Sequence, residues 1–380
     1  MRGNITRRGR DSWRLKFDAG RDSGGKRKIQ YHTFRGTKRE AQVKLAELIA
    51  AVTTGNYVEP SKLTVAEFVR ARVDQWEAAG DISARTAQRY RQLVEYQIAP
   101  QLGTVILQKL RPLDIEQWHG TLRANGRVRG KGGVAPRTIG HAHRILSKAL
   151  GDAAKNELVG RNVAKLEPPP KVTDKEMVIV RDVPGLVKKL QDSHLCAQAM
   201  LALFTGMRLG EVLALRWRAV DLDGRVIQVR EALEQTKAHG IRFKPPKSKA
   251  GRRNITLPDI LVEALREYRR QRLEIRMQLG TGKMPADALV FADIAGEPIS
   301  LYAASAAWRT FAESMGMPDV TFHSLRHTHA SQLIDAGVDI VTISRRLGHA
   351  KPDITLRIYA HLFRKDDGKA AAAINAAINH

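Results

Sequence analysis

The pattern of apolar and polar positions divides the chain into three segments. In residues 1–58, apolar and polar side chains alternate over Trp13–Phe17 and Lys28–Phe34, as they do in half-buried β-strands. Thr37 and Glu40 then have the spacing of a capping box in front of a helical apolar series. The pattern predicts a two- or three-stranded sheet braced by one helix, which is too small to form an enzyme by itself.

Residues 61–166 follow the helical period throughout. Helix starts are indicated at Thr64, which opens a second capping box, and at Ser83, Pro112 and Thr138. Four helices of this kind predict a compact bundle of about 100 residues.

A linker and a mixed segment complete the chain. Neither a helix nor a central strand tolerates Pro168–Pro170, so a linker is expected across residues 166–176. Beyond it, helices are expected on both sides of Gly206 and from Pro258 onward, and short strands at 226–229, 241–243 and 254–257. The predicted fold class is multidomain α+β, with a mixed, mainly helical third domain over residues 175–380 that holds a small antiparallel sheet.

The charge of the chain favours a polyanionic partner. The 64 Lys and Arg residues outnumber the 39 Asp and Glu residues, for a formal net charge of +25. The excess is spread evenly, at +8 or +9 in each of the segments 1–60, 61–170 and 171–380. Because every segment is basic, nucleic acid is the first choice of partner. The alternative is a solvated basic surface that serves only solubility.

Three further features indicate a reducing, aqueous compartment. Cys196 is the only cysteine, which excludes an intramolecular disulfide. No apolar run approaches the ~18 residues that a membrane span needs, and the basic start of the chain leads into polar residues instead of a signal-peptide core. We therefore expect a cytoplasmic protein with no membrane partner.

Four short motifs of the third segment become informative when they are considered together. They are TGMRLGE at 205–211, KSKAGRR at 247–253, HSLRH at 323–327 and LGH at 347–349, the last followed ten residues later by Tyr359. Each alone is typical of an ordinary helix or loop. Together they supply the groups that a phosphodiester transfer requires.

The phosphate and the leaving group have candidate partners in these motifs. Arg208 and Arg326 can grip the non-bridging oxygens, because a guanidinium meets a phosphate in a bidentate way. A lysine on a basic hairpin can protonate the departing 5′ oxygen once the surrounding cations lower its pKa. Lys247 and Lys249 both fit this role, and their spacing does not choose between them.

One residue is a candidate for the nucleophile, and two histidines are candidates for assisting its deprotonation. Tyr359 can attack phosphorus if neighbouring cations and an imidazole ease its deprotonation, and His323 and His349 can supply that help. A zinc site that uses His323, His327 and His329 is a weaker alternative, because the Glu of the H-E-x-x-H motif is absent.

The combination resembles the tyrosine recombinase, or phage integrase, family. The family signature is T-G-x-R-x-x-E, a hairpin Lys, H-x-x-R, L-G-H and a Tyr about ten residues beyond that His, and all of these elements occur here in order. The resemblance implies that Tyr359 forms a 3′-phosphotyrosyl link and that Glu211 buttresses the site. It also implies that the phosphate is activated by Arg208, Lys247, His323, Arg326 and His349. Lys247, which fits the family's K-T-x-x-S-x-R run best, is the preferred lysine, with Lys249 as the fallback.

The resemblance also implies domain roles and partners. Residues 1–58 resemble an arm-type DNA-binding module, residues 61–166 a helical core-binding domain, and residues 175–380 the catalytic domain. The implied activity is site-specific recombination that integrates a phage or mobile element, on double-stranded DNA with core and arm attachment sites. The implied assembly is a homotetramer on DNA, with a host DNA-bending protein and a directionality factor as accessory partners. No cofactor or metal is expected, because protein cations would take the place of divalent ions.

Two other functions stay open at this point. A type IB topoisomerase uses the same tyrosine chemistry, and a non-catalytic DNA-binding protein would use Tyr359 only for packing. A short apolar helix expected over Ala370–Ile378 could dock on its own chain or on a neighbouring subunit.

Overall fold

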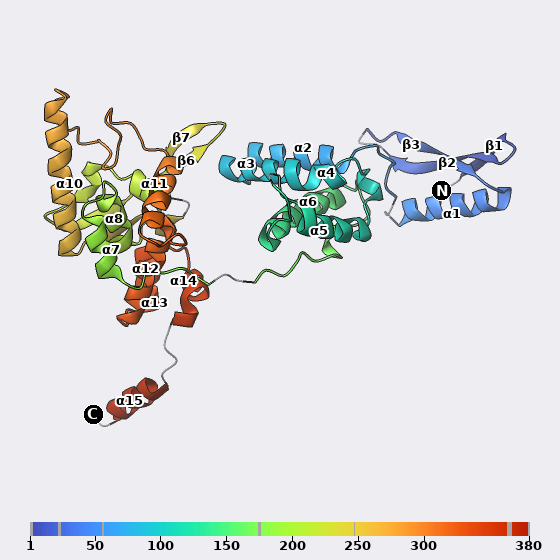
Figure 1. Ribbon diagram of the computed structural model, residues 1–380. Helices are drawn as coiled ribbons and strands as arrows, with labels where there is room; N and C mark the ends of the chain where they lie inside the picture. Colours follow the sequence, from blue (N-terminus) through green and yellow to red (C-terminus); the bar gives the residue numbers. More distant parts are fainter. Residues whose placement is uncertain are drawn as a thin grey trace. The chain divides into compact units, whose positions relative to one another are not determined.

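The computed structural model describes residues 3–21, 24–54, 57–128, 130–173, 176–246, 248–362 and 367–378. The chain divides into two compact units, Met1–Thr173 and Asp174–His380 (Figure 1). Within the described residues, no helix is long and apolar enough to cross a membrane.

The first unit begins with a three-stranded antiparallel sheet. Its strands β1 (Asn4–Gly9), β2 (Ser12–Arg21) and β3 (Arg27–Arg35) pair in that order. Helix α1 (Lys38–Thr53) begins at the predicted Thr37–Glu40 capping box and packs on β2. Alternate residues of β2 turn inward, which buries Leu15 and Phe17 against the helix.

Helices make up the rest of the first unit. They are α2 (Val65–Ala78), α3 (Ala84–Leu93), the π-helical η1 (Val94–Ile98), α4 (Ala99–Leu102), η2 (Leu107–Lys109), α5 (Pro112–Asn125), α6 (Pro136–Lys155) and η3 (Val163–Lys165). Trp76 and Trp118 are fully buried in their common core. The predicted start at Thr138 is wrong by two residues: α6 begins at Pro136, whose fixed φ and missing N–H suit the first helical position.

The second unit mixes helices with two small antiparallel sheets. Its helices are α7 (Val183–Leu190), α8 (Cys196–Thr205), α9 (Leu209–Leu213), η4 (Trp217–Ala219), η5 (Lys249–Gly251), α10 (Asp259–Gln278), α11 (Leu301–Ser314), α12 (Phe322–Asp335), α13 (Ile340–Leu347), α14 (Pro352–Tyr359), η6 (Ala360–Leu362) and α15 (Asp367–Ile378). The strands β4 (Val220–Asp221), β5 (Val226–Val229) and β8 (Arg253–Thr256) form one sheet, and β6 (Ala232–Thr236) pairs with β7 (Gly240–Lys244). The predicted α+β class is confirmed.

Helix α8 lies at the centre of the second unit. Nearly all of its side chains are buried, and it packs against α7, α10 and α12. Helices α12, α13 and α14 follow one another in contact (Figure 1). Their mutual core contains Ile343 and Leu347 together with Tyr359. The last residue of α14 is thereby fixed against the middle of α12.

The sequence analysis expected the lysine-rich stretch to lie in a hairpin, and this prediction is wrong. Residues 245–252 connect β7, in the two-stranded sheet, to β8, in the three-stranded sheet. The strand Ala232–Thr236 was not predicted, because its sequence lacks the alternation of a strand. It becomes a strand by pairing with β7.

Candidate active site

Five of the six predicted site residues line one pocket of the second unit. This pocket has a volume of about 580 Å³, and its walls come from α9, the β6–β7 sheet, the loop after β7, α12 and the region from Gly348 to Tyr359. The predicted residues in its walls are Arg208, His323, Arg326, His349 and Tyr359. Side chains that lie up to 151 positions apart in the sequence are thus brought together by the fold.

A glycine turn sets the position of the first arginine. Gly206 ends α8 in the left-handed region, at φ +67°, and a Cβ there would lie 2.7 Å from Leu347 and 2.8 Å from His329. The chain then turns so that Arg208 becomes the N-cap of α9. The T-G-x-R sequence is therefore needed both for the backbone conformation and for close packing against α12 and α13.

A buried carboxylate holds Arg208 and a second arginine. Glu211 is 4% exposed; it accepts hydrogen bonds from Arg208 Nη1 at 3.0 Å and from Arg253 Nη2 at 2.9 Å. Burial alone would raise the pKa of Glu211, but the charges of Arg253 and Arg208 outweigh it and keep that pKa below its usual value. Arg208 remains partly exposed toward the pocket, at 42% of its side chain.

Arg326 and His349 form a second buried pair. Arg326 is 2% exposed; its Nη1 donates to the Gly206 carbonyl at 2.5 Å and its Nη2 lies 2.8 Å from His349 Nε2. A guanidinium only donates, so His349 Nε2 accepts, and its proton lies on Nδ1, 2.6 Å from Thr355 Oγ1. Burial lowers the pKa of Arg326 to about 9 and that of His349 to about 4, which leaves the arginine charged and the histidine neutral at pH 7.

Tyr359 is bound by a histidine that the sequence analysis had not assigned to the site. Tyr359 is 1% exposed, and its Oη lies 2.8 Å from Nδ1 of His327. The His327 ring in turn meets the His323 ring edge to face, with 4.6 Å between their centroids. Burial raises the pKa of Tyr359 to about 12, although Arg326 and Arg208 counteract part of this effect. The tyrosine is therefore a neutral phenol at pH 7.

The three histidines of α12 do not converge on one point. His327 faces Tyr359, whereas His329 accepts a hydrogen bond from Arg346 Nε at 3.1 Å. In the part of the chain that the structure describes, no three His, Cys, Asp or Glu side chains are grouped to hold a metal ion. The alternative of a zinc site at His323, His327 and His329 is therefore wrong.

Of the two candidate lysines, only Lys249 lies within the described residues, and it does not line this pocket. Lys247 lies outside the described residues. Lys249 is exposed at the start of η5. The residues on either side of Lys247, Pro246 and Ser248, both line the pocket.

Besides His327, two supporting residues were missed by the sequence analysis. Arg253 bridges Glu211 to the Arg346 carbonyl, and Thr355 orients His349. Arg253 is the last residue of the KSKAGRR motif and Thr355 lies between His349 and Tyr359, but their partners are 42 and 6 positions away, so no local spacing marks their roles. The adjacency of His327 to Arg326 was the one signal available in the sequence.

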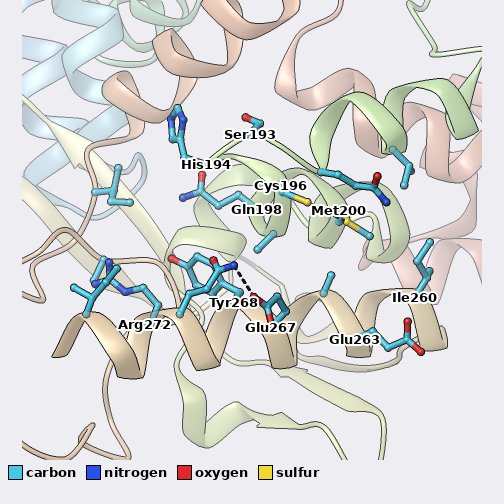
Figure 2. A pocket seen from close by; sticks show the side chains of 18 residues that line it. Ser193, His194, Cys196, Gln198, Met200, Ile260, Glu263, Glu267, Tyr268 and Arg272 are labelled. Atoms are coloured by element: carbon cyan, nitrogen blue, oxygen red, sulfur yellow. Dashed lines mark hydrogen bonds between the residues drawn. The ribbon is translucent and has the colours of Figure 1, made fainter. Parts of the chain in front are cut away.

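A second pocket of the same unit lacks this chemistry. It has a volume of about 640 Å³ and lies between α8 and α10, with Cys196 and Met200 on one side and Tyr268 on the other (Figure 2). Of the described site residues, none lines it. Size alone therefore does not identify the site.

Replacing Glu211 with Gln is expected to destabilise the second unit by about 3 to 5 kcal/mol at pH 7, because Arg253 would stay buried without a counter-ion. The carboxylate has a lowered pKa in the fold, so its contribution is complete above the pKa of an unfolded Glu, about 4.3, and is lost as the pH falls further. Urea unfolding at pH 7 and at pH 3 measures both effects. Glu267→Gln, which breaks an exposed pair on α10, is the control, and an equal effect of the two variants at pH 7 would contradict the assignment.

Comparisons with known proteins agree with the geometry. Residues 181–366 match the profile of the phage integrase family, and residues 69–123 match the phage integrase N-terminal SAM-like domain. The chain is 23% identical to a tyrosine recombinase XerC-like protein of Caldanaerobacter subterraneus, with 98% of each chain covered. It is 26% identical to an integrase of Streptomyces ambofaciens, over 93% of this chain and 90% of that one.

Solved structures of similar fold are also integrases. The Tn1549 transposon integrase in complex with a circular intermediate DNA has a TM-score of 0.68 at 18% identity, over 83% of this chain and 99% of that one. A lambda integrase dimer bound to a core site has a TM-score of 0.54 at 16% identity, over 93% of this chain and 94% of that one. The chain belongs to the phage integrase family, and it is a tyrosine site-specific recombinase.

Proposed function

We propose that the chain cuts and rejoins double-stranded DNA through Tyr359 and thereby integrates a phage or other mobile element into a bacterial chromosome. One observation carries this proposal: Arg208, His323, Arg326, His349 and Tyr359 line the same pocket. An ester of this tyrosine with a 3′ phosphate conserves the energy of the broken phosphodiester, so a strand can be rejoined without ATP.

Two arginines bind the scissile phosphate in this proposal. Arg208 reaches into the pocket from the N-cap of α9, while Arg326 lies in its wall beside His349. Their guanidinium groups meet the non-bridging oxygens, where negative charge grows in the transition state. His323, exposed on α12, is the acid/base neighbour of the same phosphate. His349 keeps the fork of Arg326 in its plane through the 2.8 Å contact.

Lys247 is our choice for the group that protonates the departing 5′ oxygen. Support comes from Pro246 and Ser248, its neighbours in the chain, which line the pocket. Lys249 is the fallback. Both belong to the basic KSKAGRR stretch at 247–253.

The DNA partner of this chain is proposed from its charge and from its relatives. Each segment of the chain is basic, and solved complexes of the Tn1549 and lambda integrases contain DNA. We assign arm-site binding to residues 1–58, core-site binding to residues 61–166 and catalysis to residues 175–380. The reaction would take place on DNA in the bacterial cytoplasm, with a host DNA-bending protein and a directionality factor as further partners.

We further propose a homotetramer on DNA. A lambda integrase, whose fold is similar at a TM-score of 0.50, has been solved as a tetramer bound to a Holliday junction. In this chain, α15 exposes Ile374 and Ile378, at 60% and 75%. Apolar side chains on a short helix favour docking against a host groove, and a neighbouring subunit is the host that would link the protomers.

Covalent trapping tests the proposed function. The full chain is mixed with duplex DNA from an element–chromosome junction that carries a nick near the crossover point, so that the cut fragment diffuses away. We expect a protein–DNA adduct that survives denaturation, and none with a scrambled duplex of equal length. Binding without an adduct on junction DNA would contradict the proposal and favour a non-catalytic DNA-binding role.

A further inference from the structure

The hydroxyl group of Tyr359 has a specific partner outside the six motif residues. His327 Nδ1 lies 2.8 Å from Tyr359 Oη, within hydrogen-bonding distance, and the ring centroids are 5.8 Å apart at 61°. His327 lies in the middle of α12, directly after Arg326, and both residues line the catalytic pocket. The contact therefore joins the end of α14 to the helix that carries the phosphate-binding arginine.

The surroundings of His327 keep its imidazole neutral. Burial lowers its pKa, and the charge of Arg326 lowers it further. The other described titratable groups that line the pocket are His323 and Arg326 on its own helix, Tyr359 on α14, Arg208 and Glu211 at α9, Lys244 at the end of β7 and His349 after α13. A neutral imidazole has one ring nitrogen without a proton, and when the Tyr359 O–H donates to His327, that nitrogen is Nδ1, 2.8 Å from Oη.

A proton acceptor is needed at this position. Tyr359 is almost completely buried and stays protonated in the free protein, so its Oη is a poor nucleophile until the proton is removed. Transfer of the proton to His327 would create a cation beside Arg326, which is unfavourable by itself. A phosphate held between Arg208 and Arg326 supplies the negative charge that offsets this cost.

We propose that His327 is a further catalytic residue, which receives the phenolic proton of Tyr359 at Nδ1 as Oη attacks phosphorus. This inference rests on the proposed role of Tyr359 as the nucleophile. In cleavage, the Oη–P bond forms, the P–O5′ bond breaks, and the general acid protonates the 5′ oxygen. In rejoining, the general acid takes the proton of the attacking 5′ hydroxyl, and His327 returns its proton to Oη as the Oη–P bond breaks.

The proposal is tested first with His327→Gln. Glutamine preserves a hydrogen bond to the phenol but cannot accept its proton. We expect adduct formation on nicked junction DNA to slow by about 100-fold or more. The remaining rate should rise steadily with pH, because hydroxide replaces the lost base. The matched control is His194→Gln in the other pocket, which should react like the wild type (Figure 2).

Two altered reactants distinguish a lost base from a lost acid. A substrate with a 5′-bridging sulfur has a better leaving group, and it should restore cleavage by Lys247→Ala but not by His327→Gln. Difluorotyrosine at position 359 has a more acidic phenol, and it should restore cleavage by His327→Gln. Rescue of His327→Gln by the sulfur substrate would overturn the proposal, and so would a cleavage rate within about threefold of the wild type.

A measurement on the wild-type chain covers the case in which His327→Gln fails to fold. In ¹⁵N-histidine NMR of the free protein, the resonances of His327 should report a neutral ring with Nδ1 unprotonated. A protonated Nδ1 would overturn the proposal, because that nitrogen could only donate. Absence of any Tyr359 adduct in the wild type would instead refute the proposed function, so the two failures are distinguishable.

Discussion

Replacing Tyr359 with Phe is expected to abolish the covalent adduct completely while binding of junction DNA stays within about twofold of the wild type. The two side chains have nearly the same shape, and Tyr359 is 1% exposed in the core shared by α12, α13 and α14. Packing is therefore preserved, and the change removes only the oxygen that would attack phosphorus. Denaturing gels of the nicked-substrate reaction measure the adduct, and filter binding measures affinity.

A matched control for the Tyr359→Phe substitution lies elsewhere in the same unit. Tyr268→Phe removes a phenolic oxygen from α10, beside the pocket that holds none of the described site residues (Figure 2). Its adduct yield should equal that of the wild type. If Tyr359→Phe still forms adduct at a measurable rate, another side chain is the nucleophile and the assignment is wrong.

Replacing Arg326 with Lys should slow cleavage by about 10² to 10³-fold. Arg326 donates to the Gly206 carbonyl and to His349 from two nitrogens of one planar fork, and it is only 2% exposed. A lysine has a single nitrogen, so it cannot hold the turn, the histidine and two phosphate oxygens in the same geometry. Single-turnover cleavage at saturating protein separates this loss from any loss of affinity.

The matched control makes the same Arg-to-Lys substitution on an exposed helix face away from the pocket. Arg270 pairs with Glu267 and Glu274 on the exposed face of α10, and Arg270→Lys should cleave like the wild type. Thermal unfolding of both variants separates instability from a catalytic defect. A rate for a folded Arg326→Lys within tenfold of the wild type would show that the bidentate fork is not needed.

Local signals explain which parts of the fold could be predicted from the sequence. The capping boxes at Thr37 and Thr64 form as predicted, because the two partners lie three residues apart and need no tertiary contact. At Thr138 a hydroxyl residue in a plausible position competed with Pro136, and the proline opens the helix. The strand over Ala232–Thr236 was missed because its conformation depends on pairing with β7.

In the pocket, too, local sequence motifs could be predicted and contacts between distant elements could not. The spacing of the motifs singled out Arg208, Arg326 and Tyr359, and the fold brings all three to one pocket. Their hydrogen-bond partners, such as His327 beside Tyr359, are recognised only when α12 and α14 are in contact. The lysine-rich stretch was misread as a hairpin because the strands on either side of it, β7 and β8, pair with β6 and β5 and not with each other.

The most direct test of the account is to identify the atom that joins the protein to DNA. The adduct formed on nicked junction DNA is digested with protease and nuclease, and the modified peptide is sequenced by mass spectrometry. The account predicts a single modified residue, Tyr359, carrying a nucleotide through its 3′ phosphate. A link through any other residue, or through a 5′ phosphate, would contradict it.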